Sequence, residues 1–315
     1  MVSQGYLLCL EGGGTRSQAV LMTFDGRVIQ LSESSDVNTN FVPFEQAQQA
    51  VLTAVRRVLQ AAEVQGEEVF LFVSSLVGPR FGIETFGDLC PYATYRYYVE
   101  RDVIFARAGI YRPHGVSVVA ATGATAWGLR ADDGREVAMG GWGSLLGDEG
   151  SAYALGLSGL RAAVRSYEGR DPTPTHLVEA ICQHYGLARE NFHRGLIRLA
   201  YQKPLSRAEI AGLAVVVTRL AAQNDPLAAC ITAKAAGDLA ALALHAARQL
   251  FRPEEAFEMV IAGGLVKAGD LILSPLREGL AQEFTKATWK IGSEQPAVAL
   301  GRLALYDYFI QEESC

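Results

Sequence analysis

The sequence predicts an α/β protein of two domains, each built on a β-sheet with helices packed against it. Short apolar runs alternate with longer helical patterns, which is the element order of an α/β fold. Each half of the chain also contains a hairpin with a glycine turn ahead of that alternation, which is a weak internal repeat. The length of 315 residues fits two domains and a large buried core.

The first half begins with strands joined by tight turns. A glycine-rich turn joins the first two apolar runs, and Asp25-Gly26, a pair typical of hairpins, joins the second to the third. The expected strands of this half are Tyr6–Leu10, Gln18–Phe24, Arg27–Leu31, Val69–Val73, Tyr95–Val99 and Gly115–Ala121. The expected helices are Phe44–Ala62, a short one within the ambiguous stretch Phe81–Pro91, and one that begins at Glu100. A new hairpin turning on Asp133-Gly134 then starts the second half.

The second half is mostly helical. Its expected helices are Ser151–Tyr167, Thr175–Tyr185, Arg189–Ala200, Ser206–Gln223, Pro226–Phe251, Gly269–Glu283 and Pro296–Ile310. Its expected strands are Ala256–Ala262 and Thr288–Ile291. Asp225-Pro226 predicts a helix start, because aspartate caps helix N-termini and proline favours the first helical position.

Charge and composition exclude several classes of protein. The net charge is −6 and no run of Lys or Arg is present, which argues against a nucleic-acid partner. The first residues lack the basic and apolar regions of a signal peptide, and apolar windows such as Leu213–Ala222 are interrupted far short of a membrane span. The five cysteines are scattered without metal-ligand spacing. We therefore expect a cytoplasmic protein with reduced thiols and no membrane or nucleic-acid partner.

The turn Glu11-Gly-Gly-Gly-Thr-Arg-Ser17 joins a strand to a strand. The Walker A loop and the dinucleotide fingerprint both lead into a helix, so neither is present. Three glycines still allow backbone N–H groups to approach a phosphate, with Thr15, Arg16 and Ser17 beside them. Glu11 is placed to hold a hydrated Mg²⁺ against those phosphates. The alternative is a merely flexible hairpin.

The stretch Gly140–Tyr153 holds five glycines in fourteen residues. Trp142 and Leu145-Leu146 are expected to anchor this loop through apolar contacts. Asp148 and Glu149 precede an apolar-periodic run, where a helix N-terminus with unpaired N–H groups favours an acid or a bound anion. The alternative is an ordinary connection in which one acid caps the helix.

Three glycine-containing turns follow predicted strands: Gly12–Gly14, Thr122-Gly123 and Gly263-Gly264. Ligands of open α/β sheets gather beyond the carboxyl ends of the strands, so these turns predict a nucleotide in a cleft between the domains. Asp102, in the first turn of an expected helix, is an acid that reaches the same space. Asn38 and Asn40 lie in a polar loop, either as turn formers, which their residue type favours, or as ligands for hydroxyl groups.

Together these motifs resemble the sugar-kinase/heat-shock-70/actin superfamily, and within it the N-acetylglucosamine kinases and BadF-type ATPases. The turn from Glu11 to Ser17 is similar to the first phosphate loop of that family. Thr122-Gly123 is similar to the second, and Ala262-Gly-Gly264 resembles the adenosine motif. The most specific match is Gly140–Tyr153, with its Gly-Gly-Trp-Gly and Gly-Asp-Glu-Gly-Ser segments. The matched order and spacing cover essentially the whole chain.

The resemblance implies two RNase-H-like domains of the actin/hexokinase type around a nucleotide cleft. Residues 1–120 form the first domain, and residues 121–295 form the second, which contains a helical insertion. The last helix, residues 296–315, packs back on the first domain. The implied activity is ATP- and Mg²⁺-dependent phosphorylation of the 6-hydroxyl of an amino sugar, with N-acetylglucosamine the first to test. A homodimer is implied as well.

The resemblance also assigns roles to individual residues. Asp102 is similar in position to the catalytic base, which takes the proton of the sugar 6-hydroxyl; without the resemblance it reads as an acid at a helix N-terminus. The positions that contact the sugar correspond to Asn40, Ser75, Thr122, Gly123, Gly141 and Asp148. The positions that contact the nucleotide correspond to Gly12, Gly13, Gly14, Thr15, Arg16, Thr122, Gly263 and Gly264. An ionised Asp148 accepts hydrogen bonds from two sugar hydroxyls at once.

Some residues depart from the family pattern. Near the expected phosphate site, Ala121 adds a methyl group where the family has glycine, and Ala124 removes a hydroxyl group where it has serine. Ser74–Gly78 lacks paired glycines. A sugar-binding sensor without turnover is therefore an alternative. Another is an ATPase that activates a partner enzyme, although such activators carry an iron–sulfur cluster for which no suitable cysteine pair is present. The acceptor stays open among N-acetylglucosamine, glucosamine, N-acetylmuramic acid and glucose, because one contact to the sugar's 2-substituent decides such a choice.

Overall fold

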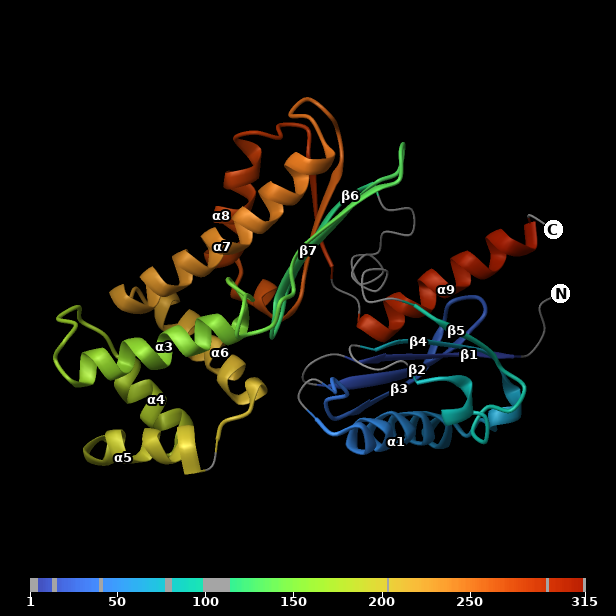
Figure 1. Ribbon diagram of the computed structural model, residues 1–315, viewed down its shortest axis with the longest axis horizontal. Coiled ribbons are helices and arrows are strands. Elements are labelled where there is room, and N and C mark those ends of the chain that lie inside the picture. Colours follow the sequence, from blue (N-terminus) through green and yellow to red (C-terminus); the bar gives the residue numbers. More distant parts are fainter. Residues whose placement is uncertain are drawn as a thin grey trace. The chain divides into compact units, whose positions relative to one another are not determined.

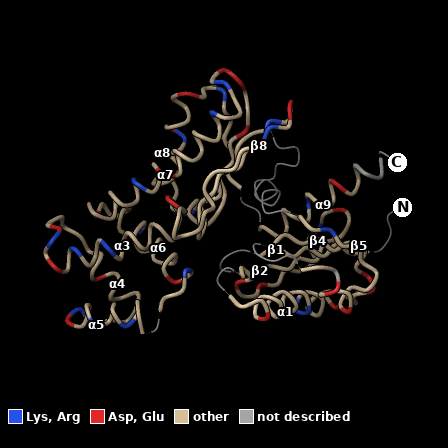
Figure 2. Tube along the Cα trace, in the orientation of Figure 1, with Lys and Arg blue, Asp and Glu red and all other residues tan. Residues whose placement is uncertain are grey.

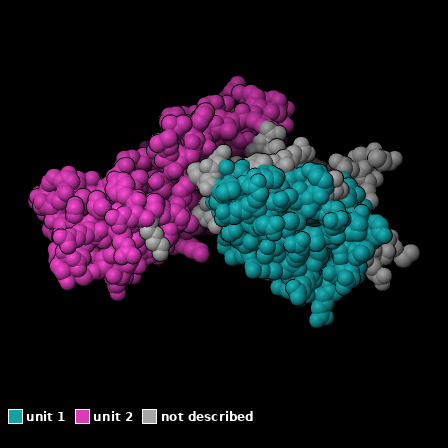
Figure 3. All heavy atoms as spheres, turned by 60° about the horizontal axis from the view of Figure 1, so that its bottom comes forward, with its two compact units in different colours: residues 1–112, 292–315 teal, residues 113–291 magenta. Residues whose placement is uncertain are grey.

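The computed structural model describes residues 5–12, 16–39, 42–76, 81–98, 114–202, 204–292 and 295–313. The chain divides into two compact units, Met1–Arg112 with Gly292–Cys315 and Pro113–Ile291, which Figure 3 colours separately. The domain boundaries predicted from the sequence, at residues 120 and 295, stay a prediction. Each unit contains one five-stranded sheet.

The sheet of the first unit combines a hairpin meander with parallel strands. Its strands are β1 (Tyr6–Gly12), β2 (Ser17–Thr23), β3 (Val28–Ser34), β4 (Val69–Leu76) and β5 (Thr94–Tyr97). Their order is β3-β2-β1-β4-β5. β1, β2 and β3 pair antiparallel, whereas β1, β4 and β5 pair parallel.

Two helices cover opposite faces of this sheet, α1 (Phe44–Ala62) and α9 (Pro296–Glu313) (Figure 1). Side chains alternate between the two faces along a strand. Leu8 and Leu10 of β1 therefore pack with α1, whereas Leu7 and Cys9 pack with α9. Helix α9 thus packs on the sheet of the first unit. Two short 3-10 turns, Gly66–Glu68 and Ile83–Thr85, flank β4, so the ambiguous stretch after β4 contains only a brief helical turn.

The second unit repeats the strand order of the first. Its strands are β6 (Gly115–Ala120), β7 (Ala124–Arg130), β8 (Arg135–Gly140), β9 (Glu258–Ala262) and β10 (Thr288–Ile291). The order β10-β9-β6-β7-β8 again places a three-stranded antiparallel meander beside two parallel additions. The internal repeat and the α/β class predicted from the sequence are confirmed.

Six α-helices are described in the second unit, within residues 114–202 and 204–292. They are α3 (Ala152–Tyr167), α4 (Leu177–Tyr185), α5 (Phe192–Ile197), α6 (Arg207–Ala222), α7 (Pro226–Leu250) and α8 (Asp270–Ala281). The helix expected at Arg189–Ala200 is instead a 3-10 turn, the short α5 and a π-helical turn at Arg198–Gln202. The Asp225 cap of α7 is confirmed, because its carboxylate accepts from the N–H of Ala228 at 3.0 Å.

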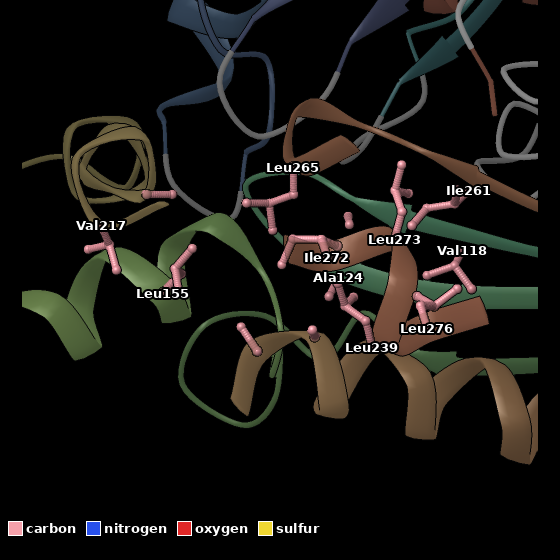
Figure 4. Packing of buried hydrophobic residues seen from close by; sticks show 14 of the residues in the cluster. Val118, Ala124, Leu155, Val217, Leu239, Ile261, Leu265, Ile272, Leu273 and Leu276 are labelled. Carbon is pink, nitrogen blue, oxygen red and sulfur yellow. The ribbon is translucent and has the colours of Figure 1, made fainter. Parts of the chain in front are cut away.

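Helices α3 and α6 approach each other unusually closely. A Cβ atom on Gly156 of α3 would lie 1.9 Å from the carbonyl oxygen of Ile210, and one on Gly159 would lie 2.6 Å from Val217 of α6. Both residue numbers rise together along the contact, so the helices run in the same direction and their N-termini lie side by side. Figure 4 shows Leu155 of α3 facing Val217 across this contact.

By length and composition, α7 is apolar enough to cross a membrane, a feature that the search of apolar windows missed. In the structure, its buried side chains, such as Leu239, belong to the core of the second unit together with Val118, Ile261 and Leu276 (Figure 4). The exposed side of α7 carries the ion pair of Lys234 with Asp238. A core position accounts for the apolar composition of this helix.

Lys and Arg are interspersed with Asp and Glu over the described parts of both units (Figure 2).

Candidate functional site

The turn between β6 and β7 is joined to the N-terminus of α3 by backbone hydrogen bonds. Within the turn, the N–H of Ala121 donates to the carbonyl of Gly123 at 2.9 Å. From α3, the N–H of Ala152 donates to the carbonyl of Ala121 at 2.9 Å, and that of Tyr153 to the carbonyl of Thr122 at 3.3 Å. The predicted second phosphate turn is therefore a firmly held part of the second unit.

These contacts close the N-terminus of α3. Of the other two N–H groups of this terminus, that of Ser151 donates to the carbonyl of Asp148 at 3.0 Å and that of Ala154 donates to the Oγ of Ser151 at 3.0 Å. The first four N–H groups of a helix are the ones that could bind an anion, and all four have acceptors here. Of the possibilities that the sequence left open here, the N–H groups therefore fit a closed connection and not a bound anion. The capping side chain is Ser151, and Glu149 is exposed.

Asp148 lies against the β6–β7 turn. Its side chain is buried, and its Oδ1 accepts a hydrogen bond from the backbone N–H of Ala124 at 3.2 Å. A Cβ atom on Gly123 would lie 2.8 Å from the same oxygen, so the carboxylate can approach the turn only because residue 123 is glycine. Asp148 has a φ of 63°, in the left-handed region that aspartate tolerates better than most residues.

The second carboxylate oxygen of Asp148 contacts Arg207, a residue that the sequence interpretation missed. Arg207 Nη2 lies 3.1 Å from Asp148 Oδ2, and its guanidinium carbon lies 5.9 Å from the centre of the Tyr153 ring. Arg207 is the first residue of α6, just after the capping residue Ser206. A positive charge in the first turn of a helix is unfavourable, because it opposes the helix dipole. That placement is the signal in the sequence that Arg207 pairs with a carboxylate outside its own helix.

The charge state of Asp148 depends on opposing effects. Burial raises the pKa of its carboxyl above the usual value, and the nearby charge of Glu149 raises it further. The hydrogen bond from Ala124 and the positive charge of Arg207 both lower it. An acid whose folded pKa is raised becomes protonated at a higher pH than a solvent-exposed one. Any function that needs the ionised carboxylate is therefore lost as the pH falls through that raised pKa.

The glycine loop that follows β8 turns toward the same place. Gly140 and Gly141 both have a φ of 72°, a conformation that glycine adopts without strain. The N–H of Gly141 donates to the carbonyl of Ala124 at 2.9 Å. Ala124 thus binds Gly141 through its carbonyl and Asp148 through its N–H. The structure brings together four of the predicted sugar residues, which are Thr122, Gly123, Gly141 and Asp148.

The side chain of Ala124 does not face the phosphate site that the resemblance implied. Its side chain is almost fully buried in the hydrophobic core of the second unit, near Leu239 in Figure 4. The expectation that its methyl group replaces a hydroxyl near the phosphates is therefore wrong. Side chains of a strand point alternately to the two faces of its sheet. Ala124 is the first residue of β7, and its side chain points to the face that the core covers.

The apolar residues of the glycine loop do not anchor it. Trp142, Leu145 and Leu146 are 74%, 91% and 74% exposed. The loop is instead closed by its backbone, because the N–H of Gly147 donates to the carbonyl of Gly143 at 2.9 Å. The prediction of an apolar anchor is wrong, and three large apolar side chains project into solvent next to Gly141 and Asp148.

We expect Trp142→Ala to leave the free energy of unfolding within about 0.5 kcal/mol of the parent protein, because the side chain buries little surface. Trp127 on β7 is the matched control, since only 4% of it is exposed. Trp127→Ala should cost roughly 3–5 kcal/mol. Thermal unfolding followed by circular dichroism measures both. A large loss of stability in the Trp142 variant would contradict the exposed position.

The two glycines after β9 differ in their surroundings. Gly263 has a φ of 104°, and a Cβ atom there would lie 2.3 Å from the carbonyl oxygen of Ala120 at the end of β6. A Cβ atom on Gly264 would have no heavy atom within 4 Å. Gly263 is therefore required by the close approach of β6 and β9, whereas Gly264 borders open space that a ligand can occupy.

In the first unit, Glu11 and Gly12 belong to β1 and not to the turn after it. Glu11 is buried and pairs in register with Gln18 of β2 and Ser75 of β4. A Cβ atom on Gly12 would lie 2.2 Å from Val37, so packing inside the unit already requires this glycine. Ser75 is buried as well. The strand therefore extends two residues beyond its predicted end.

Arg16 forms an exposed ion pair with Glu33, with Arg16 Nη1 2.9 Å from Glu33 Oε1. Exposed pairs contribute little free energy, so this guanidinium is readily available to an incoming phosphate. Among the described residues, no group of three or more His, Cys, Asp or Glu side chains is placed to hold a metal ion. The predicted residues that lie outside the described part of the chain are Gly13, Gly14, Thr15, Asn40 and Asp102.

Comparison with known proteins places this arrangement in a family. Residues 10–300 match the BadF/BadG/BcrA/BcrD ATPase family. The chain belongs to that family. The resemblance inferred from the glycine motifs is thereby confirmed.

Individual relatives of the chain carry kinase names. The N-acetylmuramic acid/N-acetylglucosamine kinase of Clostridium acetobutylicum is 26% identical over 294 residues, covering 89% of this chain and 92% of the relative. The N-acetyl-D-glucosamine kinase of Dictyostelium discoideum is 23% identical, covering 96% and 99%. A crystal structure of a candidate N-acetylglucosamine kinase from Chromobacterium violaceum shares the fold with a TM-score of 0.68 at 24% identity, covering 96% and 98%. This likeness confirms the actin/hexokinase-type fold.

Proposed function

We propose that this protein is an ATP-dependent kinase that phosphorylates the 6-hydroxyl of an amino sugar. The observation that carries the proposal is the buried Asp148 carboxylate, held at the β6–β7 turn by the N–H of Ala124 and by Arg207. Membership of an ATPase family and the kinase names of the two relatives support it. N-acetylglucosamine is the first acceptor to test, because both relatives carry that sugar in their names.

On the sugar side, Asp148 accepts hydrogen bonds from sugar hydroxyls. An ionised carboxylate only accepts, and each oxygen has a further lone pair beside the one used by Ala124 or Arg207. Thr122 and Gly123 of the β6–β7 turn, and Gly141, whose N–H donates to the carbonyl of Ala124, complete this part of the proposed sugar contacts. Ser75 and Asn40 are the proposed sugar contacts of the first unit.

On the nucleotide side, the proposed contacts are backbone groups of glycine turns. Gly12, Gly13, Gly14, Thr15 and Arg16 bind phosphate oxygens, together with Thr122, and Gly263-Gly264 borders the adenosine. Open space beside Gly264 fits a bound group at that position. Glu11 would hold Mg²⁺ through water beside the ATP phosphates, because this ion usually keeps several of its water ligands. When bound, the ion neutralises charge on the phosphate oxygens.

Phosphoryl transfer needs positioning and charge neutralisation more than a strong base. Asp102 is the proposed base. Its carboxylate would orient the 6-hydroxyl and accept its proton as the sugar oxygen bonds to the γ-phosphorus and the bond from that phosphorus to the leaving oxygen of ADP breaks. The sugar contacts hold that hydroxyl in line with the γ-phosphate, which is where most of the acceleration arises.

A coupled assay for ADP release over N-acetylglucosamine, glucosamine, N-acetylmuramic acid and glucose tests the proposal. We expect sugar-dependent turnover with at least one amino sugar. Asp102→Asn should retain ATP binding by calorimetry and lose sugar-dependent ADP release by roughly 100-fold or more. Arg27→Gln, at an exposed hairpin turn, is a control that should match the parent. Turnover that persists in the Asp102 variant would show that another group is the base.

Two alternatives have definite tests. A sugar-binding sensor would show calorimetric binding of sugar without turnover, but the core position of Ala124 removes one of its two motivations. A partner-activating ATPase needs accessible cysteines for an iron–sulfur cluster. Of the four cysteines that the described ranges contain, Cys9, Cys90 and Cys182 are buried and Cys230 is exposed.

A cytoplasmic homodimer is the expected assembly, and light scattering of the purified protein measures its mass.

A further inference from the structure

We propose that Arg207 is a positioning residue of the sugar site, which holds the Asp148 carboxylate in the orientation and charge state that bind sugar hydroxyls. This inference rests on the proposed function, since it assigns a role to Asp148 in acceptor binding. It adds a residue from the helical insertion that neither the sequence motifs nor the resemblance includes. Arg207 itself acts through Asp148.

The Asp148 carboxylate is held from two sides. On one side, the N–H of Ala124 fixes Oδ1 at 3.2 Å, and Gly123 leaves room for that oxygen. On the other side, Arg207 Nη2 fixes Oδ2 at 3.1 Å. With both oxygens fixed, the plane of the carboxylate cannot rotate, and its remaining lone pairs point in constant directions. A carboxylate held by the single contact to Ala124 would rotate about it.

The fold delivers Arg207 to this place with little freedom. The close contact of Gly156 with Ile210 sets α6 against α3, and both helices run in the same direction. Ile210 is three residues after Arg207, and Ser151, which caps α3, is three residues after Asp148. Two helices that start side by side therefore place Arg207 next to Asp148.

The end of α6 that carries Arg207 is itself well defined. Ser206 and Glu209 form a reciprocal capping box, in which the Ser206 Oγ accepts from the N–H of Glu209 and the Glu209 carboxylate accepts from the N–H of Ser206. The guanidinium also lies over the ring of Tyr153. Its side chain is 19% exposed, so it is largely removed from competing water. Such a cation acts more strongly on a neighbouring carboxylate than a surface lysine would.

The charge of Arg207 matters because Asp148 is buried. Burial and the charge of Glu149 favour the protonated acid, whereas Arg207 and the N–H of Ala124 favour the carboxylate. Without Arg207, the carboxyl group takes up its proton at a higher pH. A protonated Asp148 donates one hydrogen bond and accepts fewer, so it no longer matches two sugar hydroxyls. The acid limb of the pH profile for sugar use therefore moves to higher pH.

The experiment compares Arg207→Met, which keeps the stem without the charge, with Arg207→Lys, which keeps the charge without the planar fork. We expect Arg207→Met to raise the KM and the calorimetric Kd for the sugar roughly 10–100-fold, with the KM for ATP changed less than about twofold. Its acid limb in kcat/KM for the sugar should move to higher pH. Arg207→Lys should raise KM as well, but with an acid limb close to that of the parent.

Arg219→Met is the matched control, an exposed arginine at the other end of α6. It should leave the sugar KM and the pH profile unchanged. Thermal unfolding of every variant separates lost folding from lost positioning, and if Arg207→Met is unfolded, the KM of Arg207→Lys carries the test. Unchanged sugar affinity and an unchanged acid limb in the folded Arg207 variants would overturn this inference alone. A parent protein that neither binds nor phosphorylates any of the four sugars would overturn the proposed function instead.

Discussion

Asp148→Asn is expected to lower kcat/KM for the sugar at least about 100-fold, with little change in the KM for ATP. Two donors converge on this side chain, the N–H of Ala124 and the guanidinium of Arg207. Asparagine offers one acceptor oxygen and an NH₂ group, so one donor would face another donor. Asparagine also accepts the φ of 63°, which keeps backbone strain out of the comparison. Coupled-assay kinetics measure the loss.

Stability should fall in the same variant, by roughly 1–3 kcal/mol, because the amide NH₂ group would face one of two buried donors in place of an acceptor. Glu149→Gln is the neighbouring control, since that side chain is exposed and removal of its charge should leave unfolding within about 0.5 kcal/mol. Normal sugar kinetics in a folded Asp148→Asn protein would remove Asp148 from the acceptor site and, with it, the reason for the role of Arg207.

Gly263→Ala is expected to cost roughly 3–5 kcal/mol in the free energy of unfolding. Its φ of 104° is unfavourable for any residue with a Cβ, and the added methyl would lie 2.3 Å from the carbonyl oxygen of Ala120. That atom belongs to the backbone of β6, so relief requires β6 and β9 to separate where they pair in the sheet. Chemical denaturation of the purified variant measures the cost.

Gly264→Ala is the matched control for this variant. The position is the next in the chain, its φ is not positive, and an added Cβ meets no heavy atom within 4 Å. The free energy of unfolding should therefore stay within about 0.5 kcal/mol of the parent. Equal stability of the two variants would contradict the close approach of β6 and β9. Calorimetry of ATP with the Gly264 variant then separates a ligand contact from a packing requirement.

Much of the fold was predictable because its signals are local. Aspartate before proline at residues 225 and 226 predicted the start of α7, and short apolar runs predicted the buried strands β1 and β6. The glycine motifs predicted the family because several short patterns occur in a fixed order. Each of these signals depends on residues within a few positions of one another, where backbone geometry and hydrogen-bonding requirements act directly.

The candidate site was predictable only in part. The sequence pointed to Asp148 and to the Thr122-Gly123 turn, which lie in contact in the structure. It left open whether the helix N-terminus after Asp148 binds an anion or is closed by a cap. The carbonyl groups that close that terminus belong to Ala121 and Thr122, about thirty positions earlier in the chain. No local pattern records that pairing.

By itself, the sequence determined the order of the elements, the repeated hairpin sheets, the family and most candidate residues. Only the tertiary structure decided that Arg207, 59 residues from Asp148, pairs with its carboxylate. It also decided that Trp142 faces solvent and that Ala124 faces the core. The physical reason is that each outcome depends on segments far apart in the chain, and helix packing sets the first of them. The contact of α3 with α6 through Gly156 determines which charges meet, and residue type alone does not determine how two helices dock.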